Sequence, residues 1–111
     1  LSVPVSAAED GFLAFWEAFT PAMSAGDEKA AAELVAFSIE YRDKSLDRAG
    51  FSSLWEGLFT AKNRKCLAKE KPLSDKNEDG SIAYMAFCNG TIFIFEKVGD
   101  AWKFRSTHPD D

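Results

Sequence analysis

Four side chains in this sequence are the candidates for proton transfer: Tyr41, Asp43, Tyr84 and His108. An aspartate or a histidine acts as a general base, and a tyrosine hydroxyl donates a hydrogen bond to the charge that develops during a reaction. His108 is the single histidine and lies near the end of the chain, where fraying is more common than catalysis. Acid–base chemistry is therefore expected to depend on Asp43 with Tyr41 or Tyr84.

Each of these candidates also has a structural role open to it. Asp43 lies in a polar stretch with three cations, and a loop carboxylate paired with one of them is the more common arrangement. The cations are Arg42, Lys44 and Arg48. Tyr84 either donates into a cavity or reaches a backbone carbonyl, and the second role is the more frequent one for a buried phenol.

The two cysteines, Cys66 and Cys88, have no CxxC spacing and no second histidine beside them, so the sequence argues against a zinc site. If the segment 64–70 pairs antiparallel with a strand at 81–88, the two thiols come close enough for a cross-strand disulfide. Two buried thiols that act as small apolar side chains are an equal alternative. We expect no metal and no cofactor.

The segment 75–82 repeats the first half of a calcium-binding loop. Side chains that carry oxygen stand at its first, third and fifth positions, which are Asp75, Asn77 and Asp79. The twelfth position, where a calcium loop has a bidentate glutamate, is Ala86. The sequence therefore favours a polar turn over a cation site.

Two tight-turn signatures, Asn89-Gly90 and Gly99-Asp100, organise the last third of the chain. Asn-Gly suits a type I′ turn, which needs positive φ at both central residues, and Gly-Asp suits the related II′ turn. These turns separate three apolar segments that we predict to be antiparallel strands. The strands cover residues 81–88, 91–98 and 101–107.

With two-residue loops the register of the strands follows directly, because Cys88 then lies opposite Thr91, and Tyr84 lies opposite Phe95. One face of the sheet is dominated by aromatic rings. It carries Ile82, Tyr84, Ala86, Phe93, Phe95, Trp102 and Phe104. The other face is half apolar and half charged, with Glu96 across from Lys103. It carries Ala83, Met85, Phe87, Ile92, Ile94, Glu96, Lys103 and Arg105. Water penalises so much apolar surface, so we expect this second face to be covered.

The first two predicted helices precede the sheet. Residues 8–24 have an apolar stripe at helical spacing, and Pro21 either kinks this helix or marks a restart with Thr20 as N-cap. Gly26 supplies a stop, and Asp27 caps a second helix that runs to about residue 35. The stripe consists of Phe12, Phe15, Trp16, Phe19 and Met23.

The middle of the chain has first the apolar periodicity of a strand and then that of a helix. Residues 37–43 alternate apolar and polar, which predicts a short strand with Phe37, Ile39 and Tyr41 inward. A third helix follows over residues 51–61. Residues 63–73 are ambiguous between a helical tail and a strand. The order predicts a single α+β domain over residues 1–111, with three N-terminal helices packed on a curved, mainly antiparallel sheet.

Composition excludes several classes of protein. The formal net charge is −5 and the sequence pI is about 4.9, which argues against a nucleic-acid partner. The one basic run, residues 62–71, is diluted by Glu70 and is read as a solvated strand or helix end. No stretch approaches the about 20 apolar residues of a membrane helix, so we expect no membrane insertion. The chain begins at Leu1, which favours a removed signal peptide and a periplasmic or secreted protein, the alternative being a cytoplasmic one.

Four features together resemble the NTF2-like family: Phe12-Leu-Ala-Phe-Trp16, Gly26-Asp27, the stripe from Phe51 to Phe59, and Val98-Gly-Asp-Ala-Trp-Lys-Phe104. The resemblance implies a cone whose aromatic face encloses a ligand pocket, while the other sheet face forms a homodimer. The implied pocket residues are Phe12, Trp16, Trp55, Phe93, Phe95, Trp102 and Phe104. The implied dimer interface consists of Met85, Phe87, Ile92 and Ile94.

The sequence leaves three functional hypotheses. The first is a non-enzymatic NTF2-like domain that binds a small apolar ligand or a protein partner. The second, suggested by enzymes of this family, is an isomerase, lyase or cyclase with Asp43 as general base and Tyr84 or Tyr41 as donor. In the third, the aromatic rings, Trp16, Trp55 and Trp102 among them, fill the cone and leave no pocket.

Overall fold

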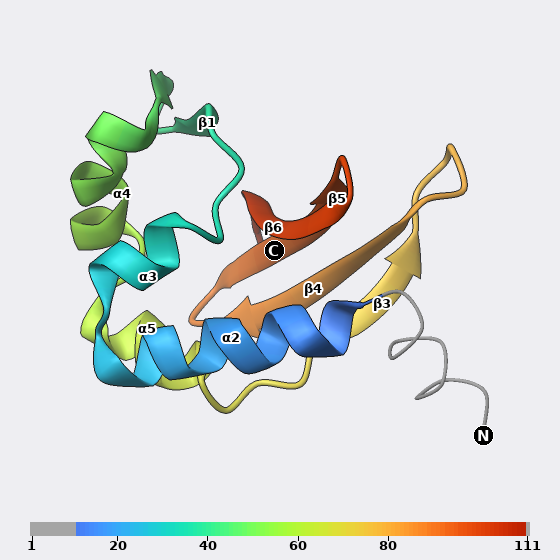
Figure 1. Ribbon diagram of the computed structural model, residues 1–111, viewed down its shortest axis with the longest axis horizontal. Coiled ribbons are helices and arrows are strands. Elements are labelled where there is room, and N and C mark those ends of the chain that lie inside the picture. The colour runs from blue at the N-terminus through green and yellow to red at the C-terminus, as the bar shows by residue number, and fades with distance from the viewer. Residues whose placement is uncertain (1–10, 111) are drawn as a thin grey trace.

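A computed structural model of the protein describes residues 11–110, and these residues form an α+β fold in which the helices precede a four-stranded antiparallel sheet (Figure 1). Four α-helices are present in this range, one more than the sequence predicts. The helices are α2 (Phe12–Ala25), α3 (Glu28–Ala32), α4 (Phe51–Gly57) and α5 (Ala61–Leu67), with a 3-10 turn η1 (Arg48–Gly50) before α4. The strands are β1 (Ile39–Tyr41), β2 (Lys44–Leu46), β3 (Leu73–Lys76), β4 (Ile82–Cys88), β5 (Thr91–Val98) and β6 (Ala101–Pro109).

The main sheet has the order β3-β4-β5-β6, and the predicted register of its three long strands is confirmed. Tyr84 lies opposite Phe95, which lies opposite Phe104, and Cys88 lies opposite Thr91. Strand β6 continues to Pro109, so His108 belongs to the strand and the expectation of a frayed end there is wrong. A register shift between Ile94 and Phe95 marks a β-bulge that the sequence did not predict.

Glu96 lies opposite Lys103 as predicted, but the two do not form the expected ion pair. Lys103 Nζ instead donates a hydrogen bond to the carbonyl oxygen of Glu33, at 2.6 Å. A carboxylate oxygen of Glu96 lies 3.9 Å from Nε of Arg105. Lys103 therefore links β6 to the end of α3, and the cation beside Glu96 is Arg105.

Helix α2 passes through Pro21 without a new start, so of the two alternatives that the sequence left open the restart with Thr20 as N-cap is wrong. Thr20 Oγ1 donates to the carbonyl of Trp16, at 3.0 Å, in the turn where a proline has no N–H to offer. The helix ends at Gly26, whose φ of 65° is left-handed, and Asp27 accepts a hydrogen bond from the backbone N–H of Ala30 as the cap of α3. The predicted start of the first helix at residue 8 lies outside the described residues.

The short strand predicted at 37–43 is β1, and it pairs only with β2, as a separate hairpin. Arg42 and Asp43 form the two-residue turn of this hairpin, with φ values of 51° and 64°. Of the predicted inward residues, Ile39 is buried, while Phe37 and Tyr41 are half-buried. Strand β2 was not predicted, because Lys44 to Leu46 carries too little apolar alternation to indicate a strand.

The segment that the sequence left ambiguous divides into a helix and a strand. Thr60 caps α5, accepting a hydrogen bond from the backbone N–H of Asn63 at 3.2 Å, so residues 61–67 are helical. Of the two alternatives for this segment, the helical one therefore holds over residues 64–67, and the pairing of 64–70 with the strand at 81–88 does not form. The strand that pairs with β4 is β3, which begins after Pro72. Pro72 thus marks the boundary between the two elements.

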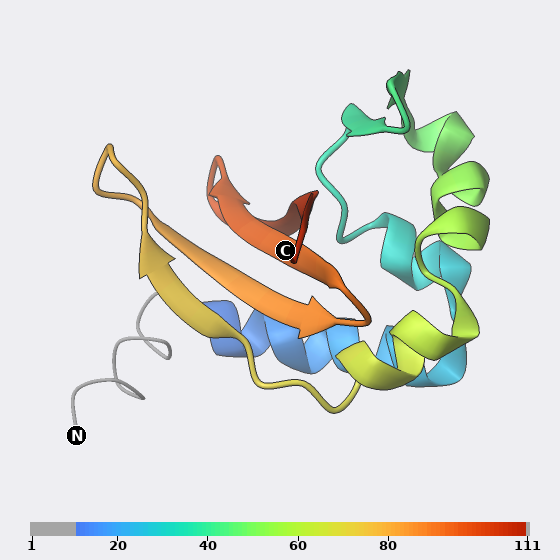
Figure 2. The same ribbon diagram turned by 180° about the vertical axis from the view of Figure 1, so that it is seen from behind.

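The helices pack against one face of the sheet through aromatic rings. Figure 2, in which β3 and β4 lie in front of α2, shows that α2 covers the far side of these strands. Three ring contacts connect the helical side to successive strands. These are Phe12 on Tyr84, Phe19 on Phe95, and Phe59 on Phe104. All six side chains are buried, so the aromatic face predicted from the register forms the core.

The opposite surface of the sheet, which we call the outer face, retains apolar side chains. It consists of Leu73, Met85, Phe87, Ile92 and Ile94. Leu73 is 61% exposed and the other four are half-buried. Within residues 11–110 no helix is long and apolar enough to cross a membrane.

Candidate functional site

Tyr41 and Asp43, the first two predicted catalytic residues, do not converge on a common cavity. Asp43 is an exposed residue of the β1–β2 turn, and its positive φ takes it out of the strand alternation that would have placed it beside Tyr41. The Tyr41 ring lies directly over Gly57 of α4, where an added Cβ would approach Cζ of the ring to 3.0 Å. The hairpin is therefore packed on α4 by Tyr41, and Asp43 faces solvent.

Tyr84, the third predicted catalytic residue, lies in the core of the main sheet. Its ring stacks on that of Phe12 with centroids 3.7 Å apart and planes 2° apart. The ring of Trp102 meets Tyr84 edge to face at 5.2 Å. Because Tyr84 packs with α2 and β6 while Tyr41 packs with α4, the structure does not bring the two phenols and Asp43 together as an acid–base site.

The seven residues expected to line a ligand pocket pack against one another and their neighbours instead. Phe93, Phe95 and Phe104 have no exposed surface, and the centroid of the Phe104 ring lies 5.9 Å from that of Phe93 and 5.7 Å from that of Phe95. Trp16 and Phe12 stack 5.7 Å apart on α2, and the remaining members continue the same packing. Those members are Trp55 and Trp102. The rings thus pack among themselves, and Trp102 also lines a surface hollow beside the turn between β3 and β4, so the ligand pocket stays a prediction.

Cys66 and Cys88 are joined by a disulfide that ties α5 to β4. The link runs from a helix to a strand, so the predicted cross-strand geometry is wrong although the two residues are paired. A carboxylate oxygen of Glu70 lies within 4.8 Å of both sulfur atoms. With the sulfurs bonded to each other, this group offers no thiolate to a metal ion.

The segment that resembles a calcium loop forms the turn between β3 and β4. Asp79 accepts hydrogen bonds from Ser81 Oγ at 2.6 Å and from the Ser81 backbone N–H at 2.9 Å. These bonds, the side-chain one first, hold the pKa of Asp79 below its ordinary value. Asn77 Nδ2 donates to Ser81 Oγ and to Glu96. Asp79 and the side-chain amide nitrogen of Asn77 are thus engaged in the hydrogen bonds of a polar turn.

The sequence reading missed a cationic surface on α5. Lys62 and Lys65 follow the i, i+3 spacing of one face of α5, Lys69 lies in the turn after the helix, and all three are exposed. The spacing of these lysines is visible in the sequence, but it indicates a common surface only if residues 61–67 are helical. Comparison with known protein families, with curated proteins and with solved structures finds no match to this chain.

Proposed function

We propose that this protein is a non-enzymatic NTF2-like domain that works by binding a protein partner and that pairs with a second copy through its outer face. The NTF2-like assignment is supported by the element order, in which an aromatic-rich helix, a Gly-Asp break and a second helix precede a short two-stranded hairpin, two further helices and an antiparallel meander. The observation that carries the proposal is the difference in burial between the two faces of the main sheet. One face is filled with helical aromatic rings, and the other keeps Met85, Phe87, Ile92 and Ile94 partly open to water.

The charges around the outer face are compatible with burial of this face against a second copy of the chain. Glu96 and Arg105 lie at one end of the face with 3.9 Å between their charged groups, so the charges largely compensate each other within one subunit. A copy pairing with this face therefore covers apolar side chains without burying an isolated charge. The same patch is present on every copy, which is the requirement of a two-fold interface.

The partner in this proposal is a protein and not a small apolar ligand. The aromatic rings that a pocket would expose are packed against one another, so a ligand would have to displace core side chains. The alternative of an isomerase, lyase or cyclase gains no support from the geometry, because Asp43, its proposed base, is an exposed turn residue.

We also propose that the protein is exported to a periplasmic or extracellular compartment. The disulfide between Cys66 and Cys88 supports this, since disulfides persist in oxidising compartments and are rare in reducing ones. Alkylation of the protein in freshly lysed native cells, under conditions that trap free thiols, should leave both cysteines unmodified. Two alkylated cysteines would contradict export.

Sedimentation at micromolar concentration tests the dimer. The wild-type protein should sediment as a dimer, and Ile94→Glu should sediment as a monomer because it places a charge within the outer face. Leu13→Glu is the matched control, since Leu13 is 50% exposed on α2 and lies outside the outer face. A wild-type monomer, or an Ile94→Glu dimer, would rule out this interface.

A further inference from the structure

A surface hollow of about 410 Å³ lies between the last turns of α2 and helix α5. Its lining combines apolar and basic side chains, an unusual combination in a chain of net charge −5. The apolar members are Met23, Ala61 and Ala68, and the basic members are Arg64, Lys65 and Lys69. A hollow of this kind accepts an apolar side chain at its centre and anionic groups at its edge.

The basic members of the lining have different roles. Arg64 Nη1 donates to the carbonyl of Phe59 at 2.7 Å, and its guanidinium lies 5.0 Å from the ring centroid of Trp55, so Arg64 is held in place by the protein itself. Lys65 and Lys69 are exposed, and no carboxylate of residues 11–110 lies within ion-pair distance of either. These two lysines are the cations that remain for a partner.

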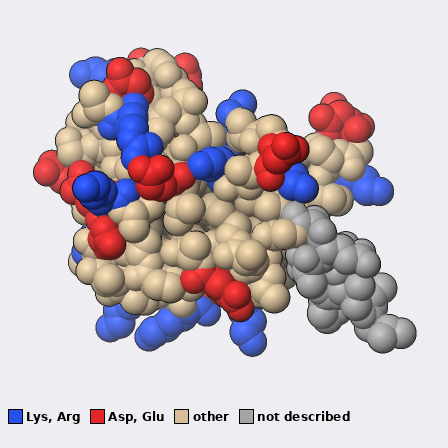
Figure 3. All heavy atoms as spheres, in the orientation of Figure 1, with Lys and Arg blue, Asp and Glu red and all other residues tan. Residues whose placement is uncertain are grey.

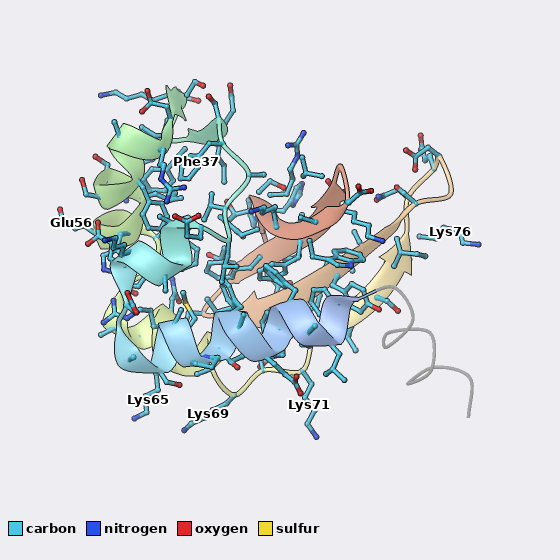
Figure 4. All side chains as sticks on the ribbon, in the orientation of Figure 1. Phe37, Glu56, Lys65, Lys69, Lys71 and Lys76 are labelled. Carbon is cyan, nitrogen blue, oxygen red and sulfur yellow. A yellow bond between two sulfur atoms is a disulfide. The ribbon has the colours of Figure 1, made fainter. Side chains whose placement is uncertain are left out.

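The lysines of the hollow belong to a longer strip, which consists of Lys62, Lys65, Lys69 and Lys71. Figure 4 shows Lys65, Lys69 and Lys71 projecting from the same edge of the molecule, and Figure 3 shows cationic atoms along that edge with a smaller group of acidic atoms beside them. Glu70, which dilutes this run in the sequence, turns its carboxylate to within 4.8 Å of the disulfide sulfurs. The run from Lys62 to Lys71 thus holds four lysines, one arginine and one glutamate.

Two other basic residues of the surface have an acidic partner beside them. Arg48 forms an ion pair with Glu33, and Arg105 lies beside Glu96. The lysine strip therefore carries positive potential on a molecule that is acidic overall, and such a patch steers a negatively charged partner toward one orientation.

We propose that the hollow between α2 and α5, with the lysine strip beside it, docks an acidic segment of a partner protein. An apolar side chain of the segment enters the hollow, and flanking carboxylates contact Lys65 and Lys69. A polypeptide fits better than a flat lipid surface, because a bilayer has no projecting side chain to fill the hollow. The inference rests on the proposed function only in taking the domain to act by binding protein.

The test uses a fluorescent synthetic peptide in which glutamates flank single leucines, with binding followed by anisotropy. The wild-type protein should bind it, and affinity should fall as salt is raised. Lys65→Glu/Lys69→Glu should weaken binding about tenfold or more, and Lys65→Ala/Lys69→Ala should weaken it less, because charge reversal adds repulsion. Lys76→Glu is the matched control, since Lys76 is an exposed lysine of β3 at a distance from the strip in Figure 4 and should bind as wild type does.

Equal affinity of wild type and Lys65→Glu/Lys69→Glu would overturn the inference. So would equal binding of a peptide in which lysines replace the glutamates, or binding to phosphatidylglycerol vesicles without binding to the peptide. Circular dichroism of each variant verifies that it is folded. The Ile94→Glu variant distinguishes the docking site from the proposed dimer, because it should lose the dimer and keep the peptide affinity of wild type. A wild-type protein that dimerises but does not bind the peptide would rule out the docking site and leave the dimer proposal standing.

Discussion

The ring of Phe95 meets the ring of Phe19 edge to face, with centroids 5.2 Å apart and planes at 78°. Phe95 lies on β5 and Phe19 on α2, so this contact joins the first helix to a central strand of the sheet. Phe95 contacts four further rings and has no exposed surface. Those rings belong to Phe12, Phe15, Trp16 and Phe104. The centre of the fold is consequently a continuous aromatic core.

Phe95→Ala should lower the free energy of unfolding by about 3–5 kcal/mol, because it removes a fully buried ring and leaves a cavity. Denaturation in urea measures this change. The cavity should also admit a small apolar probe such as benzene, so that the probe stabilises the variant and leaves the wild type unchanged.

Leu13→Ala is the control for Phe95→Ala, since Leu13 is 50% exposed and its truncation should change stability by less than about 1 kcal/mol. Stabilisation of the wild-type protein by benzene to the same extent as the variant would show that a pocket already exists among these rings, and would restore the apolar-ligand hypothesis.

The disulfide gives a prediction of its own. Cys66 and Cys88 are 22 residues apart, and closing a loop of this length in the unfolded chain stabilises the native state by about 3 kcal/mol in the chain-entropy account. A thiol reductant should therefore lower the urea midpoint of the wild-type protein. Cys66→Ser/Cys88→Ser should have the low midpoint already and should not respond to reductant. A wild-type midpoint that is insensitive to complete reduction would contradict this account.

The meander was predictable because its signals are local. Asn89-Gly90 and Gly99-Asp100 set two turns, and the strict alternation of the strands then determines which side chains share a face. Tyr84, Phe95 and Phe104 were placed on one face by this reasoning alone, and the structure has them there.

The candidate site was predicted less well because it depends on features that have no local signature. The placement of Asp43 beside Tyr41 assumed that a strand continues to residue 43, whereas positive φ at Arg42 and Asp43 turns the chain back. The lysine face of α5 depended on a helix whose cap, Thr60, is followed by a short segment of only 7 residues with few apolar positions. Whether the aromatic rings enclose a pocket or fill it depends on packing distances, which no spacing pattern contains.

The turn at Gly90 tests whether a left-handed backbone requires glycine there, because an added Cβ would meet no neighbouring atom. Gly90 has a φ of 80°, and no heavy atom lies within 4 Å of the position that a Cβ would occupy there. Gly90→Ala should therefore lose about 1–2 kcal/mol of stability from backbone strain alone. Gly90→Asn should lose less, since asparagine tolerates this region of φ better than alanine. Equal urea midpoints for the two variants would argue against a left-handed backbone at this position.

The hydrogen bonds of Asp79 give the last prediction. Ser81 Oγ donates to Asp79 at 2.6 Å and the Ser81 backbone N–H donates at 2.9 Å, and these bonds favour the charged carboxylate. Ser81→Ala removes the side-chain bond, which contributes most to the lowered pKa, and keeps the backbone bond. The pKa of Asp79 should therefore rise in the variant, toward the ordinary value for aspartate, in an NMR titration of the side-chain carboxyl carbons.

The same shift predicts how stability depends on pH. Because the pKa of Asp79 is lower in the folded protein than in the unfolded chain, its contribution to stability is present above the unfolded pKa and is lost as pH falls through the folded pKa. Ser81→Ala should therefore lose less stability than wild type on acidification over this range, whereas Ser74→Ala, at an exposed position of β3, should follow wild type. An Asp79 titration unchanged by Ser81→Ala would mean that the backbone N–H alone, and not the hydroxyl, holds the carboxylate in its charged form.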